Sequence, residues 1–274
     1  MAKGNEEARK RYFAKIAPYR KAVHDLANKE YNISRMLQNY DPGVAYKRLA
    51  LVEDHLTAAS YHLAMSSLSL SLLGIRSETE LVGAKKSCAL AIAQLEDVFT
   101  GLIDVPFQDY SSSLEAISSF GESKRYGLVR KTGLALSMVK DGFSENSKWR
   151  WPLMILKARL AAVAKNCLNL QTLAQGMDPR YEGYGERTEF FKLVEKLLQD
   201  AADGYRMRYE MATKNVGDFR LAINFLGALQ RLSLILGRQN EANEFKRKSE
   251  IWRRNMETES KKQESWSAMK RSES

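Results

Sequence analysis

Residues that interrupt regular structure are scarce in this sequence, which has only five prolines and 16 glycines among 274 residues. A loop-rich β-sandwich or a collagen-like repeat contains many more of both. Runs of four or more β-branched residues between turn signals, the usual mark of strands, are also missing. These absences exclude the common all-β classes and leave a helical protein.

Cysteine is equally scarce. Cys88 and Cys167 are the only two, and each lies in an apolar stretch with helical spacing. A disulfide framework needs more cysteines and an oxidising compartment. The first eleven residues, MAKGNEEARKR, are charged and contain no apolar segment of the kind that a secretory signal has. We therefore expect two buried free thiols and a cytoplasmic protein.

Long hydrophobic runs are missing too. The most apolar stretch, residues 63–73, is interrupted by four serines, and it has about half of the roughly 20 residues that a bilayer-spanning helix needs. The whole chain is nevertheless 44% hydrophobic, which is enough apolar surface to offset the entropy of folding. We expect a globular protein without a transmembrane segment.

The sequence also lacks the common catalytic and cofactor motifs. It has no GxxxxGK[ST] phosphate loop, no GxGxxG after a strand, no GxSxG elbow and no CxxC. Of its three histidines, His24, His55 and His62, the last two are seven residues apart. A rise of about 10.5 Å along one helix keeps them from sharing a metal without a third element. We expect no cofactor, no metal and no catalytic residue, and hence a protein that is not an enzyme.

What the sequence does contain is apolar spacing of three, four or seven residues, the period of an amphipathic helix. Over residues 44–73 this spacing predicts one helix, and Gly74 supplies its stop. Ser77 and Glu80 form a Ser-x-x-Glu capping box that starts the next helix. Residues 44–102 therefore predict a long antiparallel hairpin.

The same period predicts helices in most of the remaining chain. The expected segments are 6–38, 112–120, 122–139, 153–173, 188–213, 218–236 and 239–262. Pro18 is a candidate break in the first of these, because proline removes a helical hydrogen bond. Polar, glycine-bearing stretches predict loops at 141–148 and 176–187. We predict an all-α fold of eight or nine helices in stacked antiparallel hairpins, as a bundle or a short solenoid.

The predicted organisation has three parts: a basic N-terminal helical arm at 1–43, a helical-hairpin domain at 44–262 and a polar, frayed tail at 263–274. Apolar periodicity also predicts the core. Its expected members are Leu56, Leu63, Leu95, Leu156, Leu160, Leu229 and Leu232. The same reasoning places Leu134 and Met138 in the interior.

The last helical pair, residues 218–252, resembles a tetratricopeptide-like repeat. The residues that carry the resemblance are Leu229 and the turn Leu236-Gly237-Arg238 followed by Glu241-Ala242. Such a repeat joins two helices by a short turn and has small residues where the helices approach closely. Gln230 and Ser233 depart from the family pattern, which has a small residue and an aromatic there. The resemblance implies a helical hairpin.

Charge is distributed unevenly along the chain, whose net charge is +10. Residues 1–48 carry 11 basic and 5 acidic side chains, whereas residues 49–121 carry 3 basic and 9 acidic ones. Residues 122–166 reverse the sign again, with 10 basic and 3 acidic side chains. Regions of opposite sign attract each other, within the chain or between copies, or face different partners.

The basic middle segment predicts a surface for an anionic ligand or a partner. Its candidate residues are Lys124, Arg125, Tyr126, Arg130, Lys131, Lys140, Lys148 and Arg150. We expect the lysines and arginines between positions 124 and 131 to be exposed, because so few acidic neighbours cannot neutralise them. The competing arrangement is docking onto the acidic hairpin, around Glu78, Glu80, Glu96 and Asp97. A further candidate partner surface is the glycine-rich loop, through Tyr181 and Tyr184.

These observations favour a non-enzymatic helical scaffold or adaptor. Its partner would be another protein, or a second copy in a homo-oligomer, bound through stacked hairpins. The alternative is a nucleic-acid-associated protein that uses the basic segment 122–166. The sequence leaves open whether that segment binds nucleic acid, a protein or the chain's own acidic hairpin.

Overall fold

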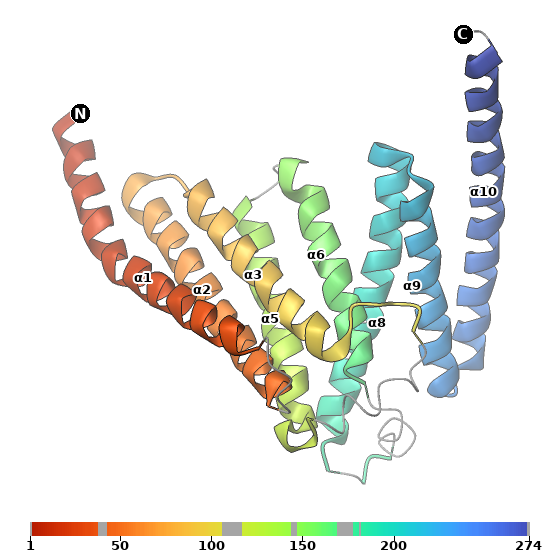
Figure 1. Ribbon diagram of the computed structural model, residues 1–274, viewed down its shortest axis with the longest axis horizontal. Coiled ribbons are helices and arrows are strands. Elements are labelled where there is room, and N and C mark those ends of the chain that lie inside the picture. The colour runs from red at the N-terminus through yellow and green to blue at the C-terminus, as the bar shows by residue number, and fades with distance from the viewer. Residues whose placement is uncertain are drawn as a thin grey trace. The chain divides into compact units, whose positions relative to one another are not determined.

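A computed structural model describes residues 2–37, 43–105, 117–143, 147–168, 178–180 and 182–272. Within these ranges the chain is all-α and contains no strand, which confirms the predicted fold class (Figure 1). The α-helices are α1 (Ala2–Met36), α2 (Val44–Leu73), α3 (Glu78–Phe99), α5 (Glu122–Phe143), α6 (Ser147–Asn166), α8 (Tyr184–Arg208), α9 (Val216–Ile235) and α10 (Gln239–Ser272). Two short elements are also described, the 3-10 turn η2 (Ser118–Phe120) and the π-helical turn η3 (Tyr209–Thr213).

The chain divides into two compact units. The first unit comprises Met1–Gly101 and Tyr110–Cys167, and the second comprises Leu102–Asp109 and Leu168–Ser274. Helices α1, α2, α3, α5 and α6 belong to the first unit, and α8, α9 and α10 belong to the second. The arm expected at 1–43 is part of the first unit, because α1 packs along α2.

Helix α1 is continuous, so Pro18 does not divide it. Proline removes one helical hydrogen bond, but Pro18 is exposed and water can solvate the carbonyl that loses its donor. The opposite side of α1 packs on α2 through Tyr12 and Ile16, which are buried together with Met65. Burial of this stripe stabilises the helix despite the proline.

The long hairpin expected in the first half of the chain is present as α2 and α3. Gly74 closes α2 in the left-handed conformation, with φ at 74°. Ser77 caps α3, because its side chain accepts a hydrogen bond from the backbone N–H of Glu80. The carboxylate of Glu80 does not return to the cap, since it contacts His62 and Arg20 instead. Only one half of the predicted capping box therefore forms.

The interior of the first unit lies where α3 packs on α2, α5 and α6, and where α5 packs on α2 and α6. The predicted core residues that are buried, in both units, are Leu63, Leu95, Leu156, Leu160, Leu229 and Leu232. The prediction for Leu56 is wrong, since this side chain is only half-buried at the surface of α2.

Both cysteines are free and buried, as predicted. Burial raises the pKa of Cys88 to about 12, and it raises the pKa of Cys167 as well. The thiolate is the reactive form of cysteine, so these two side chains stay protonated and unreactive at neutral pH.

In the second unit α9 packs on both α8 and α10. An aromatic stack joins η3, α9 and α10, because the rings of Tyr209 and Phe219 lie 4.9 Å apart and those of Phe219 and Trp252 lie 6.1 Å apart. Asn215 begins α9 by accepting a hydrogen bond from the N–H of Gly217 at 2.8 Å. The hairpin implied for residues 218–252 is thus present, and its resemblance to a tetratricopeptide-like repeat stays a prediction.

Several helix boundaries differ from the predicted ones. Helix α6 starts and ends earlier than expected, and α8 starts at Tyr184. Helix α10 continues through Ser272, into the segment expected as a frayed tail, because no proline or glycine interrupts it. The short helix expected at 112–120 lies partly outside the described residues. None of the described helices combines the length and the apolar composition that crossing a membrane requires.

Candidate partner-binding groove

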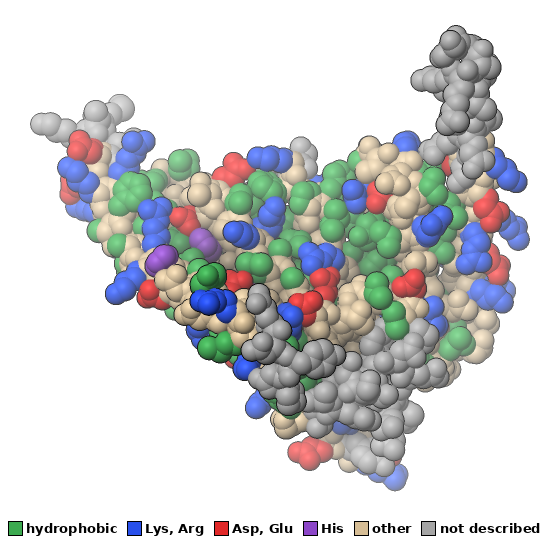
Figure 2. Space-filling model, in the orientation of Figure 1, with side chains coloured by type: hydrophobic (Ala, Val, Ile, Leu, Met, Phe, Trp, Pro, Cys, Tyr) green, Lys and Arg blue, Asp and Glu red, His purple; other side chains and the backbone are tan. Residues whose placement is uncertain are grey.

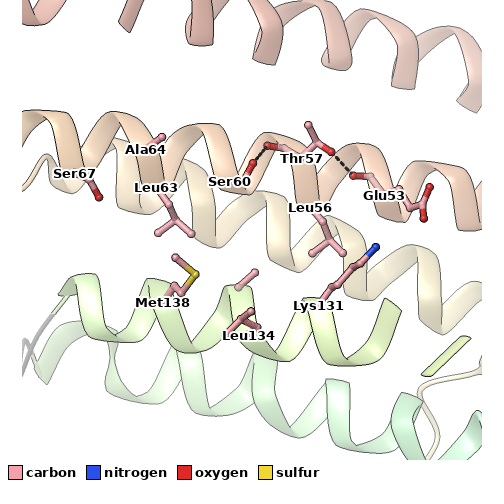
Figure 3. Close-up of a pocket in the computed structure, with 11 residues that line it drawn as sticks. Glu53, Leu56, Thr57, Ser60, Leu63, Ala64, Ser67, Lys131, Leu134 and Met138 are labelled. Atoms are coloured by element: carbon pink, nitrogen blue, oxygen red, sulfur yellow. Dashed lines mark hydrogen bonds between the residues drawn. The ribbon is translucent and has the colours of Figure 1, made fainter. Parts of the chain in front are cut away.

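A groove of about 670 Å³ runs between α2 and α5 in the first unit (Figure 3). The α2 wall consists of Glu53, Leu56, Thr57, Ser60, Leu63, Ala64 and Ser67, and the α5 wall consists of Lys131, Leu134, Ala135 and Met138. In Figure 3, Glu53 and Lys131 lie toward the same end of the groove, and Leu63 and Met138 lie toward the other end. The two helices therefore run in the same direction.

The two walls share one helical spacing. Starting from Lys131, the lining positions of α5 follow at intervals of three, four and seven residues. Starting from Glu53, the lining positions of α2 follow at the same intervals and then continue for about two more turns. Residues at these intervals share one face of a helix, so each wall is a single continuous stripe.

Apolar side chains stand exposed along the α5 wall. Leu134 is 64% exposed and Met138 is 50% exposed, whereas Leu63 on the opposite wall is only 9% exposed. Removing such apolar surface from water is favourable. A contiguous exposed apolar patch therefore marks an interaction site on a folded protein. The groove is therefore the strongest candidate for a binding surface in the first unit.

The prediction that Leu134 and Met138 lie in the interior is wrong. Helix α5 has a second apolar stripe, which includes Val129, Leu136 and Val139, and these three side chains are buried. Helices α2, α3 and α6 pack against α5. Helical spacing fits both stripes, so it could not show which of them faces the interior.

Two hydroxyls of the α2 wall are satisfied by their own helix. The hydroxyl of Thr57 donates to the backbone oxygen of Glu53 at 2.9 Å, and that of Ser60 donates to the backbone oxygen of Thr57 at 2.7 Å (Figure 3). A serine or threonine nucleophile has to donate to a base instead. These hydroxyls therefore serve as part of a packing surface.

One end of the groove carries opposite charges on its two walls. Glu53 and Lys131 are both exposed, and neither side chain forms an ion pair with any residue that the structure describes. An exposed charge costs little while it stays hydrated, and it becomes a specificity element when a partner approaches it. This end of the groove thus presents one acidic and one basic side chain to solvent.

The residues of the predicted basic patch differ in exposure. Its exposed members are Lys124, Lys131, Lys140, Lys148 and Arg150, Arg130 is half-buried, and Arg125 and Tyr126 are buried. The expectation that Arg125 is exposed is wrong, because it lies one turn before Val129 on the inner face of α5. Figure 2 shows basic and acidic side chains interspersed on the face of the first unit that it presents.

The buried Tyr126 is held by its own helix. Its hydroxyl donates to a carboxylate oxygen of Glu122 at 3.1 Å, and burial together with this negative charge raises the pKa of Tyr126. A tyrosine in such a position is a core residue, so it cannot stack on an external ligand.

Acidic residues of the predicted hairpin are engaged inside the first unit. These residues are Glu78, Glu80, Glu96 and Asp97. Glu96 accepts two hydrogen bonds from Arg159 of α6, at 2.8 and 2.5 Å, and Lys148 lies 3.5 Å from Glu78. Glu78 and Glu96 thus pair with basic residues of α6, whereas Glu80 and Asp97 pair with Arg20 of α1 and Arg48 of α2.

Glu80 joins three helices of the first unit. One carboxylate oxygen lies 2.8 Å from Nδ1 of His62 on α2, and the other lies 3.4 Å from the guanidinium of Arg20 on α1. The hydrogen bond with His62 holds the pKa of Glu80 below its usual value, against the opposing effect of burial. The histidine comes this close because its neighbour on α3 is Gly83, where a Cβ atom would lie 2.5 Å from the ring.

The remaining candidate residues lie in other places. Tyr181 is outside the described residues, and Tyr184 is half-buried as the first residue of α8. No group of histidine, cysteine and acidic side chains suited to a metal occurs in the part of the chain that the structure describes.

Sequence reasoning missed the groove, although one signal for it was present. On α2 the leucines alternate with small or hydroxylated residues such as Thr57, Ser60 and Ser67. A fully buried stripe has few such residues, so this alternation is typical of a surface that is only intermittently covered.

Comparison with known proteins gives one result. No curated protein and no solved structure matches this chain. The sequence profile of the TP0443 family matches residues 8–260, which include all of both groove walls. The chain is thus a member of the TP0443 family.

Proposed function

We propose that this protein is a non-enzymatic helical scaffold that assembles with a protein partner through the groove between α2 and α5. One observation carries the proposal: Leu134 is 64% and Met138 50% exposed along a groove in which the hydroxyls of Thr57 and Ser60 are already satisfied. Each Å² of apolar surface that a partner covers contributes roughly 25 cal/mol to association, before the cost of ordering is subtracted.

A protein helix suits this groove. The α2 wall extends from Glu53 to Ser67, which corresponds to about 20 Å of helix. Parallel helices with an apolar stripe between them form the kind of surface onto which amphipathic helices pack. The nucleic-acid alternative has no comparable support, because Arg125 and Tyr126 are buried and Lys148 lies against Glu78.

Site-specific photo-crosslinking in the native host tests the proposal. A benzophenone side chain is placed at position 134 in the groove, and at Ser137 as the control, an exposed position of the same helix that does not line the groove. We expect a protein adduct from position 134 and little or none from position 137. Equal labelling from both positions, or no protein adduct at 134, would show that the groove is not a protein-binding site.

A further inference from the structure

We propose that Lys85 of α3 is a reactive amine at which this chain accepts an acyl group from an activated donor, a thioester or an acyl phosphate. Lys85 does not line the groove between α2 and α5, so the inference is independent of the proposed function. It depends on how three helices of the first unit hold two lysine side chains against one tryptophan ring.

Close packing of α3 on α5 and α6 places Lys85 beside an aromatic pair. Leu81 precedes Lys85 by one turn on the same face of α3, and it packs on α5 so closely that a Cβ atom at Gly142 would lie 2.5 Å from it. The next residue of α5, Phe143, stacks on Trp149 in the first turn of α6, with 4.7 Å between the ring centroids. The Nζ atom of Lys85 lies 4.3 Å from the centroid of that indole ring.

A second ammonium group shares this ring. The Nζ atom of Lys148 lies 4.9 Å from the Trp149 centroid. The electron-rich face of an indole attracts a cation, so one ring holds two like charges near each other. The Oε1 atom of Glu78 lies 3.5 Å from Nζ of Lys148 and accepts a hydrogen bond from Nε1 of Trp149 at 3.2 Å. No carboxylate of the described residues forms an ion pair with Lys85, so the repulsion from Lys148 acts on it without a partner charge.

Burial and the neighbouring charge both disfavour the protonated form of Lys85. The side chain is half-buried, and burial lowers its pKa below the usual value of 10.5 for a lysine. The charge of Lys148 lowers the pKa of Lys85 further. A lysine becomes a nucleophile when it is desolvated or lies next to another cation, because the neutral amine is the form that attacks. Lys85 meets both conditions, and part of its side chain is still open to solvent.

The reaction at Lys85 needs no group beyond the donor. The neutral Nζ atom attacks the carbonyl carbon of the donor, so that a C–N bond forms and the C–S or C–O bond to the leaving group breaks. The nitrogen loses one proton, which the leaving thiolate, the leaving phosphate or the solvent takes up. The product is an uncharged amide, so acylation removes one of the two charges at Trp149 and ends the repulsion with Lys148.

The rate of acetylation at single lysines of the folded full chain tests the proposal. The chain is incubated between about pH 6 and about pH 10 with a small thioester, S-acetyl-N-acetylcysteamine, or with acetyl phosphate, and peptide mass spectrometry gives the initial rate at each lysine. Lys86, the exposed next residue of α3, is the internal control. We expect the rate at Lys85 to reach half its maximum at a lower pH than the rate at Lys86. The donor that acetylates Lys85 faster identifies the class of leaving group.

Two variants show whether the neighbouring charge is the cause. Lys148→Gln removes this charge, so the half-maximal pH of Lys85 should rise toward that of Lys86, and its rate at neutral pH should fall. Lys140→Gln removes an exposed lysine of α5 that does not act on the pKa of Lys85, and it should leave the profile unchanged. Circular dichroism checks that both variants keep the helical fold.

Three results would overturn the proposal. They are the absence of acetylation at Lys85, equal half-maximal pH values for Lys85 and Lys86 in wild type, and a profile of Lys85 that Lys148→Gln leaves unchanged. The comparison with Lys86 uses only the wild-type chain, so it stays decisive even where a variant is unstable.

Discussion

Helix α5 has two apolar stripes, and their surroundings differ completely. Val129 and Val139 on the inner stripe are fully buried, whereas Leu134 and Met138 on the groove stripe are 64% and 50% exposed. Both stripes have helical spacing and similar side chains. Helix α5 packs on α2, α3 and α6, and this packing buries the first stripe but leaves the second largely exposed. The inner stripe therefore stabilises the fold, and the groove stripe is available for association.

The largest loss of stability should come from a substitution in the interior of the first unit, to which the inner stripe of α5 belongs. Leu160 on α6 is fully buried, and one of its methyl groups lies 3.6 Å from where a Cβ atom at Gly133 of α5 would be. We expect Leu160→Ala to lower the free energy of unfolding by about 2–5 kcal/mol, because it removes buried methyl groups and leaves a cavity. Denaturant titration measures this. An unchanged midpoint would mean that α6 presents a different face to α5.

A second test compares two helical glycines of the first unit, one with no space for a Cβ atom and one with space for it. Gly83→Ala should destabilise the fold by about 1–3 kcal/mol, because the added Cβ atom would lie 2.5 Å from the His62 ring and the ring would have to move. Gly127→Ala on α5 is the matched control, since it meets no atom within 4 Å and should gain up to about 1 kcal/mol of helix propensity. Thermal melting of both variants is sufficient. A stabilising Gly83→Ala would contradict the tight contact between α2 and α3.

The third test uses pH on the ion-pair cluster of the first unit. The folded chain holds the pKa of Glu80 below its usual value of 4.5. Such a carboxylate stabilises the fold above its unfolded pKa, and this contribution is lost as the pH falls through the folded value. Wild type should therefore be more stable than Glu80→Gln at neutral pH, and the difference should shrink in acid. Thermal melting at a series of pH values measures this difference. A difference in melting temperature that stays constant down to about pH 3 would rule out this contribution.

The smallest effect on folding should come from the groove. Leu134→Ala should change the free energy of unfolding of the diluted, monomeric chain by less than about 0.5 kcal/mol, because the side chain is already mostly hydrated. Denaturant titration of the diluted chain checks this. A large loss in the diluted chain would place Leu134 in the core after all.

Most helices could be predicted from the sequence, because their signals are local. Gly74 ends α2 and Ser77 begins α3, as the turn and the capping pattern indicated. The local pattern predicted the wrong contact where residues far apart in the sequence bind the same side chain. The carboxylate of Glu80 contacts His62 and Arg20, so it does not complete the capping box.

The groove could not be predicted in the same way. Its residues were identified as apolar or charged, but Leu56, Leu134 and Met138 were assigned to the interior. Arg125 was assigned to the surface and is buried. Each error concerns the direction that a helix face takes in the folded unit. That direction depends on which neighbours pack against the helix, and the spacing within one helix contains no information on its neighbours.

The all-α class and the burial of both cysteines follow from local sequence, because helical period and composition act residue by residue. Tertiary structure alone decided which stripe of α5 became interior and which acidic side chains met arginine or lysine. These outcomes depend on contacts between segments far apart in the chain, such as Arg159 with Glu96. Packing of α5 on α2, α3 and α6 buries one side of α5, and another side, with Lys131 and Leu134, forms a wall of the groove.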